Sequence, residues 1–224
     1  MKIALVGLAL AIAAGVTAAP SDEITFTAQS VNVEQPGTPV KIKILRWSTE
    51  DEMRPILTAL SAPPQQPSDA SRANAPAAGR GRAGAAGRGR GRGPAAPLPP
   101  IAAFTAALNR VPTVGYIWTN DITGYSIKYA YQTTMADGGE RIVLATDRRL
   151  GAYTNAWKAT TPAPETDYAF TVIELRMGPK GGGEGKMSLT SKIAVEEVVR
   201  TIQLENYPAA VTYLSVLSQF PSPK

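Results

Sequence analysis

Hydrophobic and polar residues alternate along most of this chain, and this period of two constrains its fold more than any other feature. In the segment ITFTAQSVNV, Ile24, Phe26 and Ala28 alternate with threonine and glutamine. Such alternation is typical of half-buried β-strands, because successive side chains point to opposite faces of a sheet. Nine segments are predicted as strands on this basis: residues 24–33, 40–47, 114–119, 124–131, 140–146, 168–177, 185–195, 200–205 and 210–217.

The strand series determines the predicted fold class. Short turn sequences separate the strands, and no alternation of strand and helix is present, which indicates an antiparallel sheet. The chain is therefore predicted to be mainly β (α+β), a sandwich or barrel of about nine strands with two short helices. Two strands are predicted to place alternate residues on one face each: Tyr125, Ile127, Tyr129 and Tyr131 in one, and Met187, Leu189, Ser191 and Ile193 in the other.

The two helices are predicted on either side of a long low-complexity segment. Ser48 or Thr49 can cap the first helix, and the acidic residues that follow suit its N-terminal dipole. Proline is tolerated in the first turn of a helix but not in its interior, so Pro55 predicts a late start. The second helix is predicted over residues 101–110, with Pro100 suited to its first turn.

Residues 1–18 have the organisation of a secretory signal peptide. Lys2 precedes an apolar run of 14 residues, and small residues follow at the cleavage position. A bilayer-spanning helix needs roughly 20 residues, so the run favours cleavage after Ala18 over a retained anchor. The protein is therefore predicted to be periplasmic or extracellular, with no transmembrane segment in the mature chain. Residues 19–224 are predicted to form a single β-rich domain.

An Ala/Gly/Pro/Arg-rich insertion at residues 61–100 interrupts this domain and is predicted to be disordered. It holds one acidic residue, Asp69, and six arginines: Arg72, Arg80, Arg82, Arg88, Arg90 and Arg92. The insertion thus supplies a charge of +5, equal to that of the whole chain. Since the segment has no aromatic residue, it is interpreted as a linker without a specific nucleic-acid partner. A weak, salt-sensitive contact of its arginines with a polyanion is the alternative.

The chain contains no histidine and no cysteine. This excludes Ser-His-Asp and Cys-His catalysis, thiolate zinc sites and histidine metal triads. The glycine-rich stretch at residues 178–186 departs from the phosphate-loop pattern at Lys180 and Met187, and it lies between two predicted strands. It is therefore interpreted as a hairpin loop. No cofactor and no metal are expected, and the protein is predicted not to be an enzyme.

The predicted ligand-binding region is the connection over residues 148–167. At 20 residues it is longer than the usual loop between strands. In one interpretation Trp157 stacks on a ligand while basic groups hold an anion. In the other interpretation, which is preferred, Trp157 is an apolar anchor that closes one end of the barrel or sandwich. The candidate ligand-binding residues are Asp147, Arg148, Arg149, Tyr153 and Trp157.

Carboxylates are the candidates for hydrolase chemistry. A glycosidase needs two of them about 5–10 Å apart across a sugar-sized cleft. Glu174 and Arg176 share one face of a predicted strand, which indicates ion pairs with neighbouring strands on a solvated surface. The acidic residues considered are Asp147, Glu165, Asp167, Glu174 and Glu205.

Six segments follow one another in a fixed order: VPTVGYIW, GYSIKYA, GGERIVLATDRRL, YAFTVIELRM, GEGKMSLTSKI and IQLENY. Behind a signal peptide, this succession resembles a family of secreted bacterial proteins that carry a domain of unknown function. The resemblance covers residues 24–60 and 101–217 and implies export without implying an activity.

The predicted function is that of a secreted or periplasmic, non-catalytic β-rich domain that binds a ligand or an envelope component. The absence of catalytic residue types and the strand series together favour it. Two alternatives stay open. The first is a barrel or sandwich that carries an apolar small ligand against the tyrosines of residues 125–131. The second is a carboxylate-based hydrolase that acts on glycans.

Overall fold

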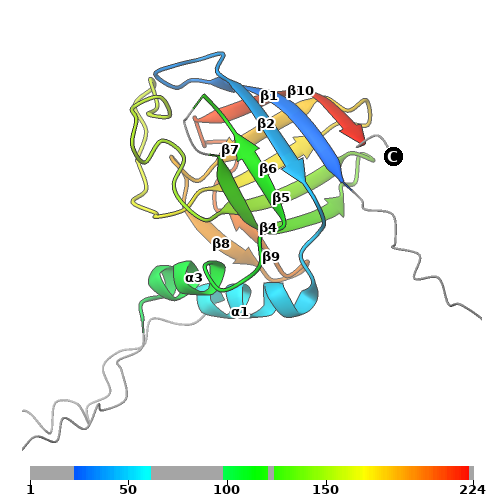
Figure 1. Ribbon diagram of the computed structural model, residues 1–224, viewed down its shortest axis with the longest axis vertical. Coiled ribbons are helices and arrows are strands. Elements are labelled where there is room, and N and C mark those ends of the chain that lie inside the picture. The colour runs from blue at the N-terminus through cyan, green and yellow to red at the C-terminus, as the bar shows by residue number, and fades with distance from the viewer. Residues whose placement is uncertain (1–22, 62–97, 121–123, 222–224) are drawn as a thin grey trace, which may run out of the picture.

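The computed structural model describes residues 23–61, 98–120 and 124–221. Within them, eight strands close into an antiparallel barrel, which two helices and a two-stranded sheet accompany (Figure 1). The predicted signal peptide and nearly all of the predicted insertion lie outside the described residues. The barrel strands are β1 (Ile24–Val31), β2 (Pro39–Ile44), β3 (Gly115–Trp118), β4 (Tyr125–Thr134), β5 (Glu140–Thr146), β6 (Val172–Met177), β7 (Gly183–Met187) and β10 (Tyr213–Pro221).

The barrel closes because β1 pairs with strands from both ends of the described chain. Ile24 of β1 lies opposite Ile44 of β2, and Val31 lies opposite Tyr213 of β10. The order around the barrel is β1-β10-β7-β6-β5-β4-β3-β2, and all neighbours are antiparallel. Closure leaves no sheet edge with unpaired backbone groups. The predicted mainly β fold with two short helices is confirmed, as a barrel of eight strands with two further strands beside it.

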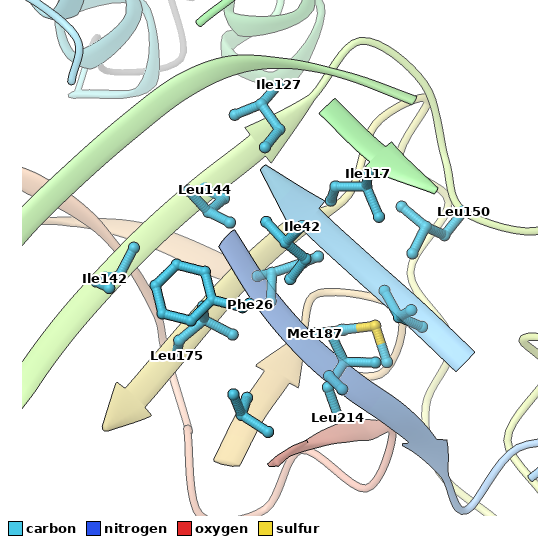
Figure 2. Close-up of a cluster of buried hydrophobic side chains, with 14 of the residues drawn as sticks. Phe26, Ile42, Ile117, Ile127, Ile142, Leu144, Leu150, Leu175, Met187 and Leu214 are labelled. Atoms are coloured by element: carbon cyan, nitrogen blue, oxygen red, sulfur yellow. The ribbon is translucent and has the colours of Figure 1, made fainter. Parts of the chain in front are cut away.

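The interior of the barrel is filled with hydrophobic side chains. Alternate residues of each strand face inward, so Phe26, Ile42 and Ile117 are completely buried. An interior of eight strands is just wide enough for side chains to fill. Figure 2 shows these side chains converging from strands around the barrel, the labelled ones being Phe26, Ile42, Ile117, Ile127, Ile142, Leu144, Leu150, Leu175, Met187 and Leu214.

The prediction that the tyrosines of residues 125–131 share one face is wrong, because β4 contains a bulge. The pairing of β4 with β5 shifts between Ile127 and Tyr129. One extra residue reverses the alternation beyond it. Tyr125 and Ile127 therefore lie in the barrel core, whereas Tyr129 and Tyr131 belong to a second cluster outside the barrel.

This second hydrophobic core lies between the outer wall of the barrel and a layer of helices and hairpin. Outward-facing residues of β4 and β5, such as Tyr129 and Val143, are buried there. The ring of Phe104 packs 4.7 Å from that of Phe170 in the same cluster. The covering elements, which Figure 1 shows together on one side of the barrel, are α1 (Glu50–Ser61), α3 (Pro100–Leu108), β8 (Ile193–Glu196) and β9 (Thr201–Leu204).

Residues 185–195, predicted as one strand with one apolar face, are divided between the two sheets. β7 ends at Met187 in the barrel core, and β8 begins at Ile193 in the outer core. Polar side chains make this crossing possible. Ser188, buried between the strands, accepts the backbone N–H of Val172 on its Oγ at 2.9 Å.

Helix α1 begins earlier than Pro55 led us to predict. The N–H of Glu52 donates to Thr49 Oγ1 at 3.4 Å, and the N–H of Thr49 donates to Glu52 Oε2 at 2.9 Å. This reciprocal capping box sets the first helical residue at Glu50. Pro55 consequently lies inside the helix, where it removes one backbone hydrogen bond.

Candidate functional site

The long connection between β5 and β6 packs against one end of the barrel (Figure 1). Trp157 is buried in the barrel core together with Leu150. The connection is also tied to the β1–β2 turn, because the N–H of Glu34 donates to the carbonyl of Lys158 at 2.9 Å. Trp157 is therefore an apolar anchor of this end of the barrel, in agreement with the preferred interpretation of the sequence.

A small pocket lies within this connection. It has a volume of about 140 Å³, and its lining includes Arg149, Trp157, Lys158 and Glu165. Arg149 holds the connection together, since its Nη1 donates to the carbonyl of Thr166 at 2.6 Å. The lining carries two basic side chains, Arg149 and Lys158, and one acidic side chain, Glu165.

The other three predicted site residues lie elsewhere. Tyr153 is 89% exposed on the loop. Asp147 lies on the outer wall of the barrel, where its Oδ1 accepts the backbone N–H of Ser126 at 3.1 Å. The guanidinium carbon of Arg148 lies 4.8 Å from the ring centroid of Tyr125. The five residues predicted as one site are thus distributed over the barrel end, the exposed loop and the outer wall.

On that outer wall, two aromatic side chains of β3 face the solvent. Tyr116 is 39% exposed and Trp118 is 41% exposed, whereas Gly115 and Ile117 between and before them are buried. The centroids of the two rings are 5.7 Å apart, and the ring planes are tilted by 38°. The two rings therefore form a shallow, open surface for stacking. The sequence signal for it was the presence of aromatic residues at the outward positions of a strand.

The strand register places basic residues beside both rings. Lys43 of β2 lies opposite Tyr116, and Lys41 lies opposite Trp118. Directly opposed residues on one face of an antiparallel pair have neighbouring side chains. We refer to Lys41, Lys43, Tyr116 and Trp118 as the aromatic patch.

Gly124 connects Trp118 with Arg148. A Cβ atom at this position would lie 3.2 Å from Trp118 Cδ1, so the indole packs closely over the glycine. Arg148 Nη2 donates to the carbonyl oxygen of the same glycine. The absence of a side chain at residue 124 therefore lets the indole lie close to the backbone of the residue that precedes β4, while the carbonyl of the same residue accepts Arg148.

The charges of the patch are unevenly committed. Lys43 Nζ forms an ion pair with Glu23 Oε2 at 2.9 Å. Lys41 is exposed, and it makes no ion pair with any residue that the structure describes. Asp147 borders the patch with its carboxylate bound to a backbone amide. Lys41 is therefore the cation that a ligand can engage without breaking an existing ion pair.

Glu174, one of the carboxylates considered for hydrolysis, has a structural environment. Its side chain is completely buried, which corrects the prediction of a solvated surface. Its Oε1 accepts from Arg141 Nε and from Arg176 Nη2, each at 2.9 Å. The backbone N–H of Leu204 donates to its Oε2 at 3.2 Å. This carboxylate therefore fastens β9 to the barrel wall.

Tyr207 extends this network. The guanidinium carbon of Arg176 lies 3.7 Å from the centroid of the Tyr207 ring, and the hydroxyl donates to the carbonyl of Glu184 at 3.2 Å. Burial, together with the nearby Glu184 carboxylate, raises the pKa of Tyr207 above its usual value. Tyr207 therefore stays neutral near pH 7 and acts as a stacking and hydrogen-bonding group.

Fold and surface together define an eight-stranded antiparallel barrel with a filled interior, one covered half of its outer wall and one half that carries exposed aromatic rings. No family model, curated protein or solved structure matches the chain. The described part of the chain contains no cluster of three or more acidic side chains suited to a metal ion. Neither described helix is long and apolar enough to cross a membrane.

Proposed function

We propose that this protein is an exported, non-catalytic β-barrel that binds a glycan of the cell envelope on its outer wall. The observation that carries the proposal is the exposure of Tyr116 and Trp118 side by side on β3, with ring centroids 5.7 Å apart. Aromatic rings present an electron-rich face, which attracts the polarised C–H groups of a sugar ring. Two such faces on a smooth strand wall suit an extended polymer.

The filled interior supports an external site over an internal one. Phe26 and nine further labelled side chains occupy the space in which a barrel would carry an apolar ligand (Figure 2). The tyrosine-lined face that motivated a carrier is divided by the bulge in β4. The outer wall is therefore the better candidate for ligand binding.

The environments of Glu174 and Asp147, two of the five carboxylates considered, support a binding function over hydrolysis by these residues. Glu174 is enclosed by two arginines and a backbone amide. Asp147 accepts a hydrogen bond from the backbone of Ser126. A general acid needs a carboxyl group that is free to reach the glycosidic oxygen, and a nucleophile or base needs one that faces the sugar. Neither of these two carboxylates has such a position.

The proposal is tested by measuring the binding of the mature chain to a panel of neutral and acidic polysaccharides, using affinity electrophoresis and calorimetry. Stacking of a ring on an aromatic side chain contributes about 1–3 kcal/mol in other polymer complexes. The double variant Y116A/W118A is therefore expected to lose at least about tenfold in affinity. The control is Y153A, which removes an even more exposed aromatic ring from the β5–β6 connection.

Two results would contradict the proposal. One is that no polysaccharide binds, or that Y116A/W118A binds as tightly as Y153A while both variants keep the circular dichroism spectrum of the parent. The other is that incubation releases new reducing ends from a bound polymer, which would contradict the non-catalytic part of the proposal.

A further inference from the structure

We propose that the pocket within the β5–β6 connection binds a small α-amino acid in its zwitterionic form. This site is separate from the aromatic patch, and the inference does not depend on the proposed glycan function. It is carried by two side chains of opposite charge, Lys158 and Glu165, which line one pocket and do not pair with each other.

The size of the pocket limits its ligand to a small molecule. Its volume is about 140 Å³. A protein cavity of about 150 Å³ holds one benzene molecule, which has as many non-hydrogen atoms as alanine. The pocket therefore has room for one small amino acid and not for a chain of sugar rings, so its ligand differs from that proposed for the outer wall.

The floor of the pocket is apolar. Trp157, Leu150 and Leu189 line the pocket and are buried in the barrel core. Gly151 also lines it, and a Cβ atom there would lie 2.9 Å from Trp157 Cδ1, so the chain passes close to the indole. Such a floor suits the Cα and the short side chain of a small amino acid, whose charged groups then meet the rim.

The rim of the pocket carries the charges. Lys158 and Glu165 are exposed, and Arg149 is half-buried. None of these three side chains forms an ion pair with any residue that the structure describes. A ligand with a single charge is attracted by one side of this rim and repelled by the other. A zwitterion can direct its carboxylate to Lys158 and its ammonium group to Glu165.

Separate backbone anchors hold the two charges at different sides of the pocket. The carbonyl of Lys158 accepts the N–H of Glu34 at 2.9 Å, which ties Lys158 to the β1–β2 turn. Thr166 follows Glu165 in the chain, and its N–H donates to the carbonyl of Leu189 at 3.1 Å. The backbone positions of both charged residues are thus set before a ligand arrives, which lowers the entropy that binding must cost.

The test compares three ligands of nearly equal size, titrated into the mature chain and followed by saturation-transfer NMR. L-Alanine carries both charges, L-lactate has a hydroxyl group in place of the ammonium, and L-alaninamide has a neutral amide in place of the carboxylate. Alanine is expected to bind roughly two- to fivefold tighter than either analogue, in line with the strength of exposed ion pairs. L-Tryptophan, which is too large for the pocket, is expected not to compete with alanine.

Substitutions then assign each charge of the ligand to one side chain. K158Q is expected to lower the affinity for alanine and lactate roughly two- to fivefold and not to lower that for alaninamide. E165Q is expected to lower the affinity for alanine and alaninamide to the same extent and not to lower that for lactate. The matched controls are K180Q in the β6–β7 loop and E197Q in the β8–β9 turn, both at exposed residues. A damaged fold would weaken all three ligands and could not produce this crossed pattern.

The possible failures are distinguishable. If alanine binds no tighter than its analogues, or if K158Q and E165Q act like their controls, the pocket does not recognise a zwitterion and the inference is wrong. If tryptophan competes with alanine, or if Y116A/W118A abolishes alanine binding, the amino acid is held elsewhere and the inference is also wrong. If none of these ligands binds, the inference fails and the glycan-binding function stands, because its two rings lie on the outer wall.

Discussion

Replacing Glu174 by alanine is expected to destabilise the fold strongly, because it removes the acceptor at the centre of a buried network. The carboxylate is completely buried and accepts from Arg141 and Arg176 at 2.9 Å. It also accepts the backbone N–H of Leu204, so it links the barrel wall to the β8–β9 hairpin. Alanine leaves all three donors without this partner.

The expected loss follows from the surroundings of each donor. Arg176 is 43% exposed and can regain water, and Arg141, at 11% exposed, keeps its ion pair with Glu196. The buried Leu204 amide has no such replacement, and an unsatisfied buried donor costs about 1–3 kcal/mol. Removing one partner of a buried ion pair costs about 3–5 kcal/mol in total. For a domain of this size, a loss of about 3–5 kcal/mol lowers the Tm by about 6–20 °C.

Thermal and urea unfolding, followed by circular dichroism, measure this loss. E34A is the control, since Glu34 is an exposed glutamate on the barrel-end turn and its replacement should change stability by less than about 0.5 kcal/mol. E174Q keeps the shape and one acceptor, so it should fall between the two. The reasoning is refuted if E174A and E34A unfold at the same urea concentration, because the buried network would then contribute nothing that water cannot replace.

Two further predictions concern the dependence of stability on pH. Hydrogen bonds from Arg46, opposed by partial burial, hold the pKa of Glu52 at about 2, below its unfolded value of 4.5. The stability that this carboxylate contributes to the fold is therefore present above pH 4.5 and is lost as the pH falls towards 2. E52Q should flatten the curve of urea midpoint against pH in this window, and a curve parallel to the parent would contradict the assignment. Burial raises the pKa of Tyr129 to about 12, so the stability it confers is lost as the pH rises from 10 towards 12. Y129F should cost about 1 kcal/mol at neutral pH, because it removes the 2.8 Å hydrogen bond to Thr201. It should also reduce the amplitude of the late ultraviolet titration, to which Tyr207 contributes as well, and an unchanged amplitude would contradict the assignment to Tyr129.

The period-two pattern predicted the barrel well where it is unbroken. Phe26 and Ile42 alternate with polar residues, and both face inward as expected. The pattern failed at β4 and after Met187, for one physical reason. Tyr129 and Ile193 are as hydrophobic as the residues of the barrel core, but they are buried in a second core outside the wall. Alternation shows that a residue is buried, and it does not show on which side of the wall the burial occurs.

The candidate site was harder to predict for a related reason. Residues close in sequence, such as Arg148 and Arg149, make contacts in different places: Arg148 lies over the ring of Tyr125, and Arg149 donates to the carbonyl of Thr166. The residues of the patch come from β2 and β3, and only the strand register brings them together. Lys41 and Trp118 are separated by two helices and the low-complexity segment along the chain. No spacing in the sequence marks such a pair.

Two parts of the outer wall differ in whether their aromatic side chains are covered by other elements of the fold. Along β4 to β6, outward aromatic residues such as Tyr129 are covered by the helices and the β8–β9 hairpin, and this burial accounts for their presence. On β3, Trp118 gains part of the same stabilisation by covering Gly124, a role that aromatic side chains often have beside strand glycines. Both rings nevertheless stay in part exposed to water, Tyr116 by 39% and Trp118 by 41%. Full burial of a large apolar side chain contributes about 1.5–3 kcal/mol to stability. An aromatic ring that is exposed to water does not make this contribution in full. The joint exposure of Tyr116 and Trp118 on β3 is therefore the feature that an external partner would explain, and the proposal of a glycan ligand rests on this pair.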